Sequence, residues 1–348
     1  MNLFVDSYKN LGMAKGKKRN LIKKFMQGRL RFTEFAITNA CIAKCSFCDI
    51  WKQHPKIFVD KEKALNAIDR LASFGVSHLT ITGGEPLLHP DVIAFVERAT
   101  KRRMNNAVLN AAPSLLTRND ILKRLEGAGC DVLSISFDSG DPVTMSESRK
   151  IPDIMDEMSR AFEMIKQTSL KTMASVLIWN DNYDKLEEVC VRAKNMGYDF
   201  VSFNYPTFSK SEVYPLGGEG VSLSRESVIH GMREAVRLRK SGKYGIINSA
   251  IAMQNIINYL QDPATIDYQC LGGNHVLFLD WFFDVHPCMQ LSKTLGNILD
   301  ENMKESDLCM PPCNDCNMSW YRDLSMFLHG VRSVPILLES LNGAKNFI

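Results

Sequence analysis

Three cysteines fall within eight residues in the first sixth of the chain, and their spacing suits metal binding. They are Cys41, Cys45 and Cys48, separated by three residues and then by two. Iron-sulfur clusters are held by thiolates, so three thiolates on one short loop can hold three irons of a four-iron cluster and leave the fourth open. A zinc site or a set of buried thiols is the alternative for the same residues. The pattern therefore predicts a metal centre with one corner free for chemistry.

A second motif, Gly83-Gly84-Glu85-Pro86, follows an apolar run downstream of these cysteines. Together with Phe47, which directly precedes the last cysteine, the two motifs resemble the cofactor site of the radical S-adenosylmethionine (radical SAM) superfamily. The resemblance implies a [4Fe-4S] cluster whose open iron chelates the amino and carboxylate groups of S-adenosyl-L-methionine (SAM). Reductive cleavage of SAM would then yield a 5′-deoxyadenosyl radical that abstracts hydrogen from a substrate.

The same resemblance assigns cofactor-binding roles to further residues. Gly83 and Gly84 would let the backbone approach SAM, since any side chain would block that approach, and Glu85 would pair with the SAM ammonium group. The other candidates are Phe47, Asn110, Ser136, Asp138, Arg149 and Asn182. Phe47 is expected to pack against the cluster or the adenine. For the remaining five a structural turn or cap is an equal alternative, and Asn110 is followed by Ala111 where relatives carry glycine.

The last third of the chain carries a second set of thiols. The set consists of Cys270, Cys288, Cys309, Cys313 and Cys316. This region resembles the SPASM and shorter twitch extensions of radical SAM enzymes, which implies one auxiliary [4Fe-4S] cluster, with one of the last three cysteines not a ligand. It departs from the family pattern at Phe283, where a glycine is usual. A zinc site is the alternative, and Cys130 and Cys190 are interpreted as spare buried thiols.

Composition favours a sizeable intracellular enzyme. The 348 residues are 45% hydrophobic and 23% charged, within the ordinary range for a globular protein. No apolar run is long enough to span a membrane and no signal peptide is evident, so the clustered cysteines predict metal binding in the cytoplasm. No nucleic-acid partner is predicted. Residues 1–31 carry a net charge of +8, which indicates either a solvated helix or peripheral membrane contact.

Strand and helix patterns alternate from residue 32 to residue 204. Strands are expected at 32–38, 78–82, 106–110, 131–137, 171–179 and 200–204, and helices at 61–74, 91–103, 118–127, 154–166 and 184–196. Such alternation implies parallel βαβ units, and six of them fit a partial (β/α)6 TIM-like barrel, an α/β fold. In parallel α/β folds the functional site lies at the carboxyl ends of the strands, where both motifs fall.

Five segments follow from these patterns. They are a basic segment at 1–30, the barrel at 31–205, a helical connection at 206–265 with helices at 224–240 and 249–260, the auxiliary-cluster domain with a β-hairpin at 276–288 within 266–322, and a helical tail at 323–348. A second Gly-Gly-Glu sequence at 217–219 is interpreted as a chance loop. The apolar tail at 331–348 indicates a packing helix or, alternatively, lipid contact.

The predicted function is radical SAM chemistry on a small-molecule, lipid or peptide substrate. The resemblance implies a reducing partner such as flavodoxin or ferredoxin, and an auxiliary cluster that aids oxidation or substrate binding. The alternative is a non-enzymatic iron-sulfur electron carrier or a metal-stabilised interaction protein, which would not need the Gly83-Gly84-Glu85 motif.

Overall fold

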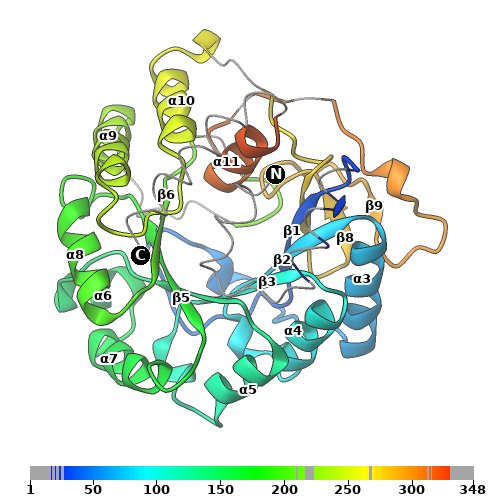
Figure 1. Cartoon of the computed structure of the whole chain (residues 1–348), viewed down its shortest axis with the longest axis horizontal. Helices are drawn as coiled ribbons and strands as arrows, with labels where there is room; N and C mark the ends of the chain where they lie inside the picture. The colour runs from blue at the N-terminus through cyan, green and yellow to red at the C-terminus, as the bar shows by residue number, and fades with distance from the viewer. Residues whose placement is uncertain are drawn as a thin grey trace.

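The computed structural model describes Lys17, Asn20, Lys23, Lys24 and residues 27–208, 211–215, 223–265, 269–311, 313–314 and 316–329. Six strands pair in parallel in chain order: β1 (Arg31–Ala36), β2 (Val76–Thr82), β3 (Asn105–Asn110), β4 (Val132–Ser136), β5 (Lys171–Leu177) and β6 (Phe200–Asn204). The helices between them are α3 (Lys61–Ser73), α4 (Val92–Lys101), α5 (Ile121–Ala128), α7 (Ile154–Ile165) and α8 (Leu186–Met196). Figure 1 shows the strands in an unclosed arc with these helices outside. The predicted partial barrel is confirmed.

One helix of the barrel was not among the predicted elements. Helix α6 (Pro142–Arg149) follows β4 and precedes α7. Its start carries two usual signals, because the Asp141 side chain accepts a hydrogen bond from Thr144 N at 2.8 Å and proline holds the first helical position. Only three of its residues are buried, so it has almost no apolar periodicity to reveal it.

The predicted hairpin near residues 276–288 is confirmed, and it extends the barrel sheet. Strand β7 (Val276–Leu279) pairs in parallel with β1, and β8 (Asp284–His286) and β9 (Gly296–Asn297) continue the sheet in antiparallel pairs. The strand order among the described residues is therefore β6-β5-β4-β3-β2-β1-β7-β8-β9. Pairing between β1 and β7 joins the cysteine-rich region directly to the strand that precedes the first cysteine loop.

Three further helices complete the described chain. They are α9 (Arg225–Ser241), α10 (Ala250–Gln261), both in the predicted places, and α11 (Ser319–Leu328). Helix α11 lies between β6 and β1 (Figure 1) and bonds to both, because Ser319 Oγ donates to Asn204 Oδ1 at 3.2 Å and Tyr321 Oη donates to Glu34 Oε2 at 3.2 Å. This helix therefore spans the open side of the arc.

Burial alternates along the last two parallel strands. Side chains that face the outer helices are buried, whereas those on the inner face are only half-buried, including Met173, Ser175 and Leu177 of β5 and Ser202 and Asn204 of β6. The inner face of this half of the arc is therefore reachable from solvent and rich in small polar groups.

Two of the described basic residues near the start of the chain, Lys17 and Lys24, pack on the protein, whereas Lys23 is exposed. Lys17 Nζ forms an ion pair with Asp131 Oδ2 at 2.6 Å, and Lys24 Nζ donates to Ala72 O and Val76 O at 3.2 and 2.8 Å. Most of the basic segment at 1–30, the sequence at 217–219 and the tail at 331–348 lie outside the described residues. Among the residues described, no helix has the length and apolar character to span a bilayer.

Candidate cofactor site

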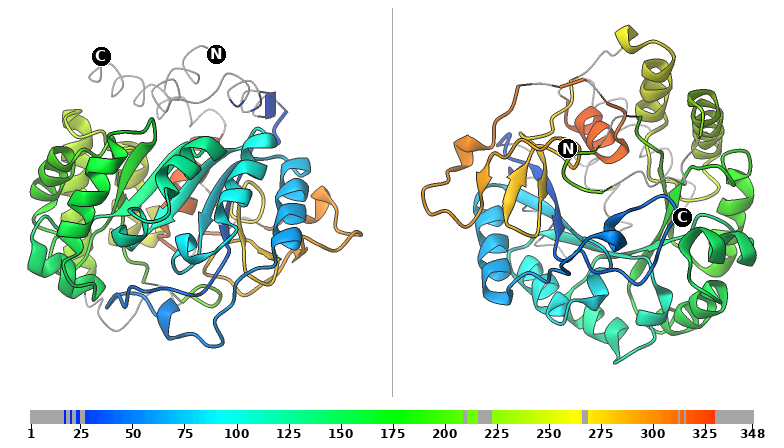
Figure 2. Two further views of the ribbon diagram at one scale, coloured as in Figure 1. Left: turned by 90° about the horizontal axis from the view of Figure 1, so that it is seen from below. Right: turned by 180° about the vertical axis from the view of Figure 1, so that it is seen from behind.

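The first cysteine loop follows β1 at the carboxyl edge of the sheet and is anchored by backbone bonds. Lys44 N donates to Arg149 O at 3.0 Å and Ser46 N donates to Ser148 O at 3.1 Å, so the loop lies along the end of α6. Figure 2 (right) shows this part of the chain, in blue, crossing one end of the barrel. The loop is therefore held between the sheet edge and α6.

The three thiols of this loop occupy one buried environment. Cys45 is buried and Cys41 and Cys48 are half-buried. Burial, with smaller contributions from other cysteines of the loop, raises the pKa of Cys41 to about 12 and that of Cys48 to about 11. Thiols in such a place become thiolate ligands only when a metal supplies the compensating positive charge.

Within the described part of the chain, no three His, Cys, Asp or Glu side chains converge on a single ion. A four-iron cluster binds each cysteine through a different iron, so its ligands surround it and need not meet at one point. The arrangement of Cys41, Cys45 and Cys48 around one loop fits that requirement.

The glycines of the second motif press against the cysteine loop. Gly84 N donates to Thr38 O and Glu85 N donates to Ala40 O, both at 2.8 Å. A Cβ atom on Gly84 would lie 2.2 Å from Ala40 O and 3.0 Å from Cys41 Cβ, and one on Gly83 would lie 2.2 Å from Thr38 O. The motif therefore needs glycine for close backbone packing against the loop, in addition to any approach of SAM.

The Glu85 carboxylate is fully buried and binds four N–H groups. Oε1 accepts from Leu87 N at 3.1 Å, and Oε2 accepts from Asn110 Nδ2, Ala111 N and Ala112 N at 3.2, 2.7 and 3.0 Å. Burial raises the pKa of Glu85 to about 7, although these hydrogen bonds oppose the rise. Glu85 thus organises the end of β3, and its predicted pairing with the SAM ammonium stays a prediction.

Among the predicted cofactor-binding residues, Asn110 is notable for its side-chain oxygen. Its Nδ2 donates to Glu85 and to Ala112 O, while its Oδ1 is buried and has no hydrogen-bond partner among the described residues. A buried acceptor without a partner is costly, so this oxygen is suited to a donor on a bound molecule.

Asp138, Arg149 and Asn182 form one buried network. Arg149 Nε and Nη2 donate to Asp138 Oδ2, the former at 2.9 Å, and Leu177 N donates to Asp138 Oδ1 at 2.8 Å. Asn182 Nδ2 donates to Asp138 O at 2.8 Å. The structure therefore brings these three predicted residues together, with Arg149 held in place by its neighbours.

The Arg149 guanidinium also faces the cysteine loop. Its Nη1 lies 3.8 Å from Cys45 Sγ, and its central carbon lies 5.1 Å from the centre of the Phe47 ring. The Phe47 ring in turn meets Trp179 edge-on at 5.4 Å between centroids. The positive charge lowers the pKa of the Cys45 thiol, although burial raises it more strongly. The remaining candidate, Ser136, is half-buried on the inner face of β4.

Four of the C-terminal cysteines gather at a second place, where Cys270 and Cys288 are buried and Cys313 and Cys316 are half-buried. Cys270 N donates to Cys313 O at 3.1 Å, and Ser325 Oγ of α11 donates to Cys270 Sγ at 3.8 Å. Burial raises the pKa of Cys288 to about 12, with smaller contributions from Cys316 and Cys270, and that of Cys316 to about 11, with contributions from Cys270 and Cys313. The fifth thiol is different, because Cys309 is exposed.

The turn between β7 and β8 explains why glycine is usual at the position that Phe283 occupies in this chain. Phe283 adopts a φ of +68°, in the left-handed region that glycine enters without strain. Its ring is buried and lies 6.0 Å from that of Phe35. The chain therefore keeps the turn geometry with a bulky residue that packs on the barrel.

Sequence reasoning missed three residues near these sites. Tyr214 Oη donates to Gly83 O, and Tyr214 interacts electrostatically with Cys48 and Cys41. Glu34 and Tyr321 are bonded to each other on the inner face, and Tyr321 interacts electrostatically with Cys288 and Cys270. Glu34 had a detectable signal, since it is a charged residue in the middle of a strand, between Phe32 and Phe35. Tyr214 lies in an irregular segment without such a signal.

The fold and the paired motifs define a class, the enzymes built on a partial α/β barrel with a cysteine loop after the first strand. The family model described as the Radical SAM superfamily matches residues 35–208. The chain belongs to the radical SAM superfamily and is an enzyme of that family, whose members carry a [4Fe-4S] cluster and use SAM.

Similar sequences and structures support this assignment. The AdoMet-dependent heme synthase of Methanosarcina barkeri (strain Fusaro / DSM 804) is 24% identical over 294 residues, which cover 79% of this chain and 81% of that protein. The PqqA peptide cyclase of Granulibacter bethesdensis is 24% identical over 163 residues, 46% of this chain and 43% of that one.

Two solved structures share the fold. The structure of anSMEcpe with bound AdoMet and Cp18Cys peptide has a TM-score of 0.58 at 15% identity and covers 90% of this chain and 99% of that one. Streptococcus suis SuiB bound to S-adenosylmethionine has a TM-score of 0.58 at 12% identity and covers 82% of this chain and 66% of that one.

Proposed function

We propose that this enzyme cleaves SAM reductively at a [4Fe-4S] cluster on Cys41, Cys45 and Cys48 and oxidises a polar substrate on the inner face of the barrel. The observation that carries the proposal is the packing of Gly83 and Gly84 against the cysteine loop by direct backbone bonds. A protein that only stored electrons would not need this second backbone surface beside its cluster.

When bound, the cluster and SAM supply a 5′-deoxyadenosyl radical, and the chain supplies the binding groups around them. The backbone of Gly83 and Gly84 forms the approach surface for the methionine part of SAM. Asn110 Oδ1 is a free acceptor beside Glu85 for a hydrogen-bond donor of SAM. Arg149, fixed by Asp138, holds a positive charge next to Cys45, which supports a role in binding the SAM carboxylate.

We propose that the substrate lies against the inner face between β1 and β6. This face presents small polar groups, among them Ser136, Ser175 and Ser202. Glu34 adds a buried carboxyl group whose Oε2 accepts from Tyr321. Such a surface favours polar substrates over a lipid chain.

A peptide is the first candidate for the substrate class. Two proteins that share this fold have been solved with peptides, SuiB bound to precursor peptide SuiA and anSMEcpe with the Cp18Cys peptide. A small molecule is the second candidate, since similarity to the Methanosarcina heme synthase extends over 79% of the chain. The polar inner face suits either a side chain of a peptide or the polar groups of a small molecule.

We also propose an auxiliary [4Fe-4S] cluster on Cys270, Cys288, Cys313 and Cys316. These four are linked by backbone bonding or by mutual electrostatic influence, and Cys309 is exposed on the surface. Tyr321, which donates to Glu34 on the inner face, interacts electrostatically with Cys288 and Cys270. A cluster in this place would accept an electron from the substrate or bind the substrate directly.

The test is anaerobic reconstitution with iron and sulfide, followed by reduction with dithionite in the presence of SAM. Chromatography should detect 5′-deoxyadenosine, and iron analysis should find about eight irons per chain, four for each cluster. Reconstituted Cys45→Ser protein should retain about four irons and form no 5′-deoxyadenosine. Wild-type protein that holds eight irons and leaves SAM intact would refute the proposed function.

A further inference from the structure

A carboxyl group lies on the inner face of the barrel, in the middle of β1. Glu34 pairs in register with Thr80 of β2 and with Phe278 of β7. Its side chain reaches α11, because Oε2 accepts from Tyr321 Oη at 3.2 Å, and it is only 8% exposed. Carboxyl groups are rarely buried in this way unless a cation or several donors compensate them.

Little of that compensation comes from the part of the chain that the structure describes. Tyr321 supplies the one hydrogen bond to this carboxyl, and no ion pair reaches it from the described residues. The other buried glutamate in this part of the chain, Glu85, accepts from four N–H groups. Oε1 of Glu34 therefore remains for a donor on a bound molecule.

Two tyrosines relate Glu34 to the two cysteine sites. Glu34 interacts electrostatically with Tyr214, which also interacts with thiols of the first cysteine loop and whose Oη donates to Gly83 O. Glu34 interacts in the same way with Tyr321, which also interacts with thiols of the C-terminal set. A substrate group bound at Glu34 would therefore lie near the glycine segment proposed to approach SAM.

We propose that Glu34 Oε1 binds a primary ammonium group of the substrate and so holds the substrate on the inner face of the barrel. The inference rests on the proposed function, because it names the chemical class of substrate for that site. Both a lysine side chain of a peptide and a small amine, such as an amino sugar, carry this group.

The geometry favours an ammonium group over the other common cation of substrates. A guanidinium binds a carboxylate with two parallel N–H donors, one to each oxygen. Here Oε2 already accepts from Tyr321, so one oxygen is left for the substrate. An ammonium group is a compact point charge that needs only one oxygen. Its charge would also compensate the buried carboxylate, which the described chain does not do.

The test measures dissociation constants of two probe pairs by calorimetry on the reconstituted full chain with SAM present. The peptide pair is Nα-acetyl-L-lysinamide and its Nε-acetylated form, and the small-molecule pair is D-glucosamine and N-acetyl-D-glucosamine. The members of each pair differ by one positive charge. In at least one pair the ammonium member should bind at least about tenfold more tightly, as for a hydrogen bond between charged groups. The pair that shows this preference identifies the source of the ammonium group.

Two variants that each remove one carboxyl group locate the preference. Glu34→Gln keeps an acceptor for Tyr321 and should bind both members of the pair equally. The control is Asp323→Asn on the same helix as Tyr321, where the carboxyl accepts from Asn248 Nδ2 at 3.0 Å. This control should keep the wild-type preference. Because both substitutions change the formal charge equally, bulk charge cannot explain a difference.

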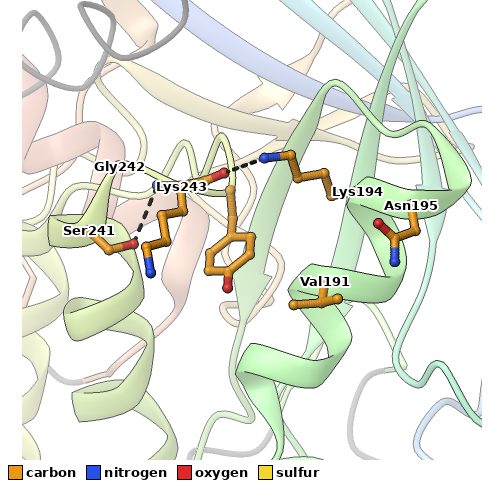
Figure 3. A pocket seen from close by; sticks show the side chains of 7 residues that line it. Val191, Lys194, Asn195, Ser241, Gly242 and Lys243 are labelled. Atoms are coloured by element: carbon orange, nitrogen blue, oxygen red, sulfur yellow. Dashed lines mark hydrogen bonds between the residues drawn. The ribbon is translucent and has the colours of Figure 1, made fainter.

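A surface pocket at the ends of α8 and α9 should not contribute to this preference. Figure 3 shows Lys194 and Lys243 at the pocket, and Lys194 Nζ donates to Lys243 O at 3.3 Å. None of the residues that line it is acidic. Like charges repel, so the cationic probes should avoid this pocket.

The pH dependence of binding adds a readout that a merely structural glutamate would not change. Burial raises the pKa of Glu34 to about 8, so below that pH the ammonium group must displace a proton. The wild type should therefore bind the ammonium probe about tenfold more tightly per pH unit from about pH 6 to 8. Glu34→Gln should lose this dependence.

The titratable neighbours of Glu34 do not produce the same dependence. Burial raises the pKa of Tyr321 and of Tyr214 well above the usual value for tyrosine, and it lowers the pKa of His78 on β2 to about 4. These three groups therefore stay neutral between pH 6 and 8. His286 of β8 is present in the wild type and in the variant, so the comparison removes its effect.

Several results would overturn the inference. One is equal affinity of the wild type for the charged and neutral members of both pairs. Others are a preference that Glu34→Gln retains, and a Glu34→Gln protein that loses affinity for SAM itself, since the carboxyl would then belong to the SAM site. A wild type that leaves SAM intact under dithionite would count against the proposed function instead, so the two failures are distinguishable.

Discussion

Replacement of Gly84 by alanine provides the sharpest test of the cofactor site. The added methyl carbon would lie 2.2 Å from Ala40 O, 2.6 Å from Ala40 C and 3.0 Å from Cys41 Cβ. Ordinary van der Waals contact begins near 3.4 Å, so the cysteine loop and the glycine segment must separate by about 1 Å.

The loop cannot give way without losing its fixed position. Gly84 N and Glu85 N bond to Thr38 O and Ala40 O on the loop side, both at 2.8 Å, and these bonds would stretch beyond the usual range. A displacement of about 1 Å in a reacting group costs roughly a hundredfold in rate. We therefore expect Gly84→Ala to slow 5′-deoxyadenosine formation about a hundredfold with dithionite as reductant.

The matched control is Gly127→Ala in α5. An added Cβ at Gly127 meets nothing within 4 Å, and alanine in a helix is favoured over glycine by about 1 kcal/mol. This variant should match the wild type in rate and unfold at a slightly higher temperature. Both proteins are compared at equal iron content, and the four irons of the auxiliary site should be present in each.

The result that would refute the reasoning is a Gly84→Ala enzyme that matches Gly127→Ala in rate and in affinity for SAM. Close packing of Gly84 against the loop would then have no part in SAM cleavage. A variant that loses iron only from the first site would still support the packing argument, because the shifted loop would have lost its ligand geometry.

Three further predictions follow. Cys316→Ser should lower the iron content by about four per chain, whereas Cys309→Ser should leave it unchanged, because that thiol is exposed. Arg149→Ala should lower the free energy of unfolding by about 3–5 kcal/mol, since it leaves Asp138 buried without its cation, and calorimetry should show the loss. Burial raises the pKa of Glu34 from 4.5 to about 8, so the folded state binds more protons there than the unfolded state. Stability should fall by up to about 1.4 kcal/mol per pH unit between pH 4.5 and 8, and Glu34→Gln should remove that slope in thermal melts.

The barrel was predictable because its strands and helices leave local patterns. The parallel strands are short and mix apolar with small polar residues, as VLSIS does in β4, and each long helix buries one face, as α7 does with Met158, Phe162 and Ile165. Helix α6 was not predicted, because it buries only Met145, Ser148 and Arg149 and has no apolar periodicity. A Pro142 start with an acidic cap was the available signal.

Pairings between distant segments left no local signal. The register of Phe32 with Val276 and of Phe35 with Leu279 joins β1 to β7 across more than 200 residues. It could not be inferred from either strand alone, because neither sequence specifies its partner strand or the register of the pairing. The contact of Cys270 with Cys313 is likewise between distant segments. Sequence alone therefore could not show that Cys309 is the thiol exposed on the surface.

Some features of the cofactor site could be predicted from local sequence and others could not. Cys41, Cys45 and Cys48 stand out through spacing, and the structure holds them on one loop. The partners of Glu85 and Asn110 could not be foreseen, since they depend on how the end of β3 folds back over the glycine motif. Local chemistry was therefore visible in the sequence, and the contacts that position it were not.

Helix α11 links the proposed auxiliary site to the inner face and spans the open side of the barrel. Its Ser325 accepts from Leu271 N at 2.7 Å and donates to Cys270 Sγ, while its Tyr321 reaches Glu34 on β1 and its Ser319 reaches β6.

The two thiol sets lie toward opposite ends of the β1–β7 pair. The first set follows the carboxyl end of β1, and Cys270 precedes the start of β7, which pairs with Phe32. The four steps from Phe32 to Ala36 alone span about 13 Å. A disturbed auxiliary site should therefore act first through α11 on the substrate face, and only later on SAM cleavage at the far end.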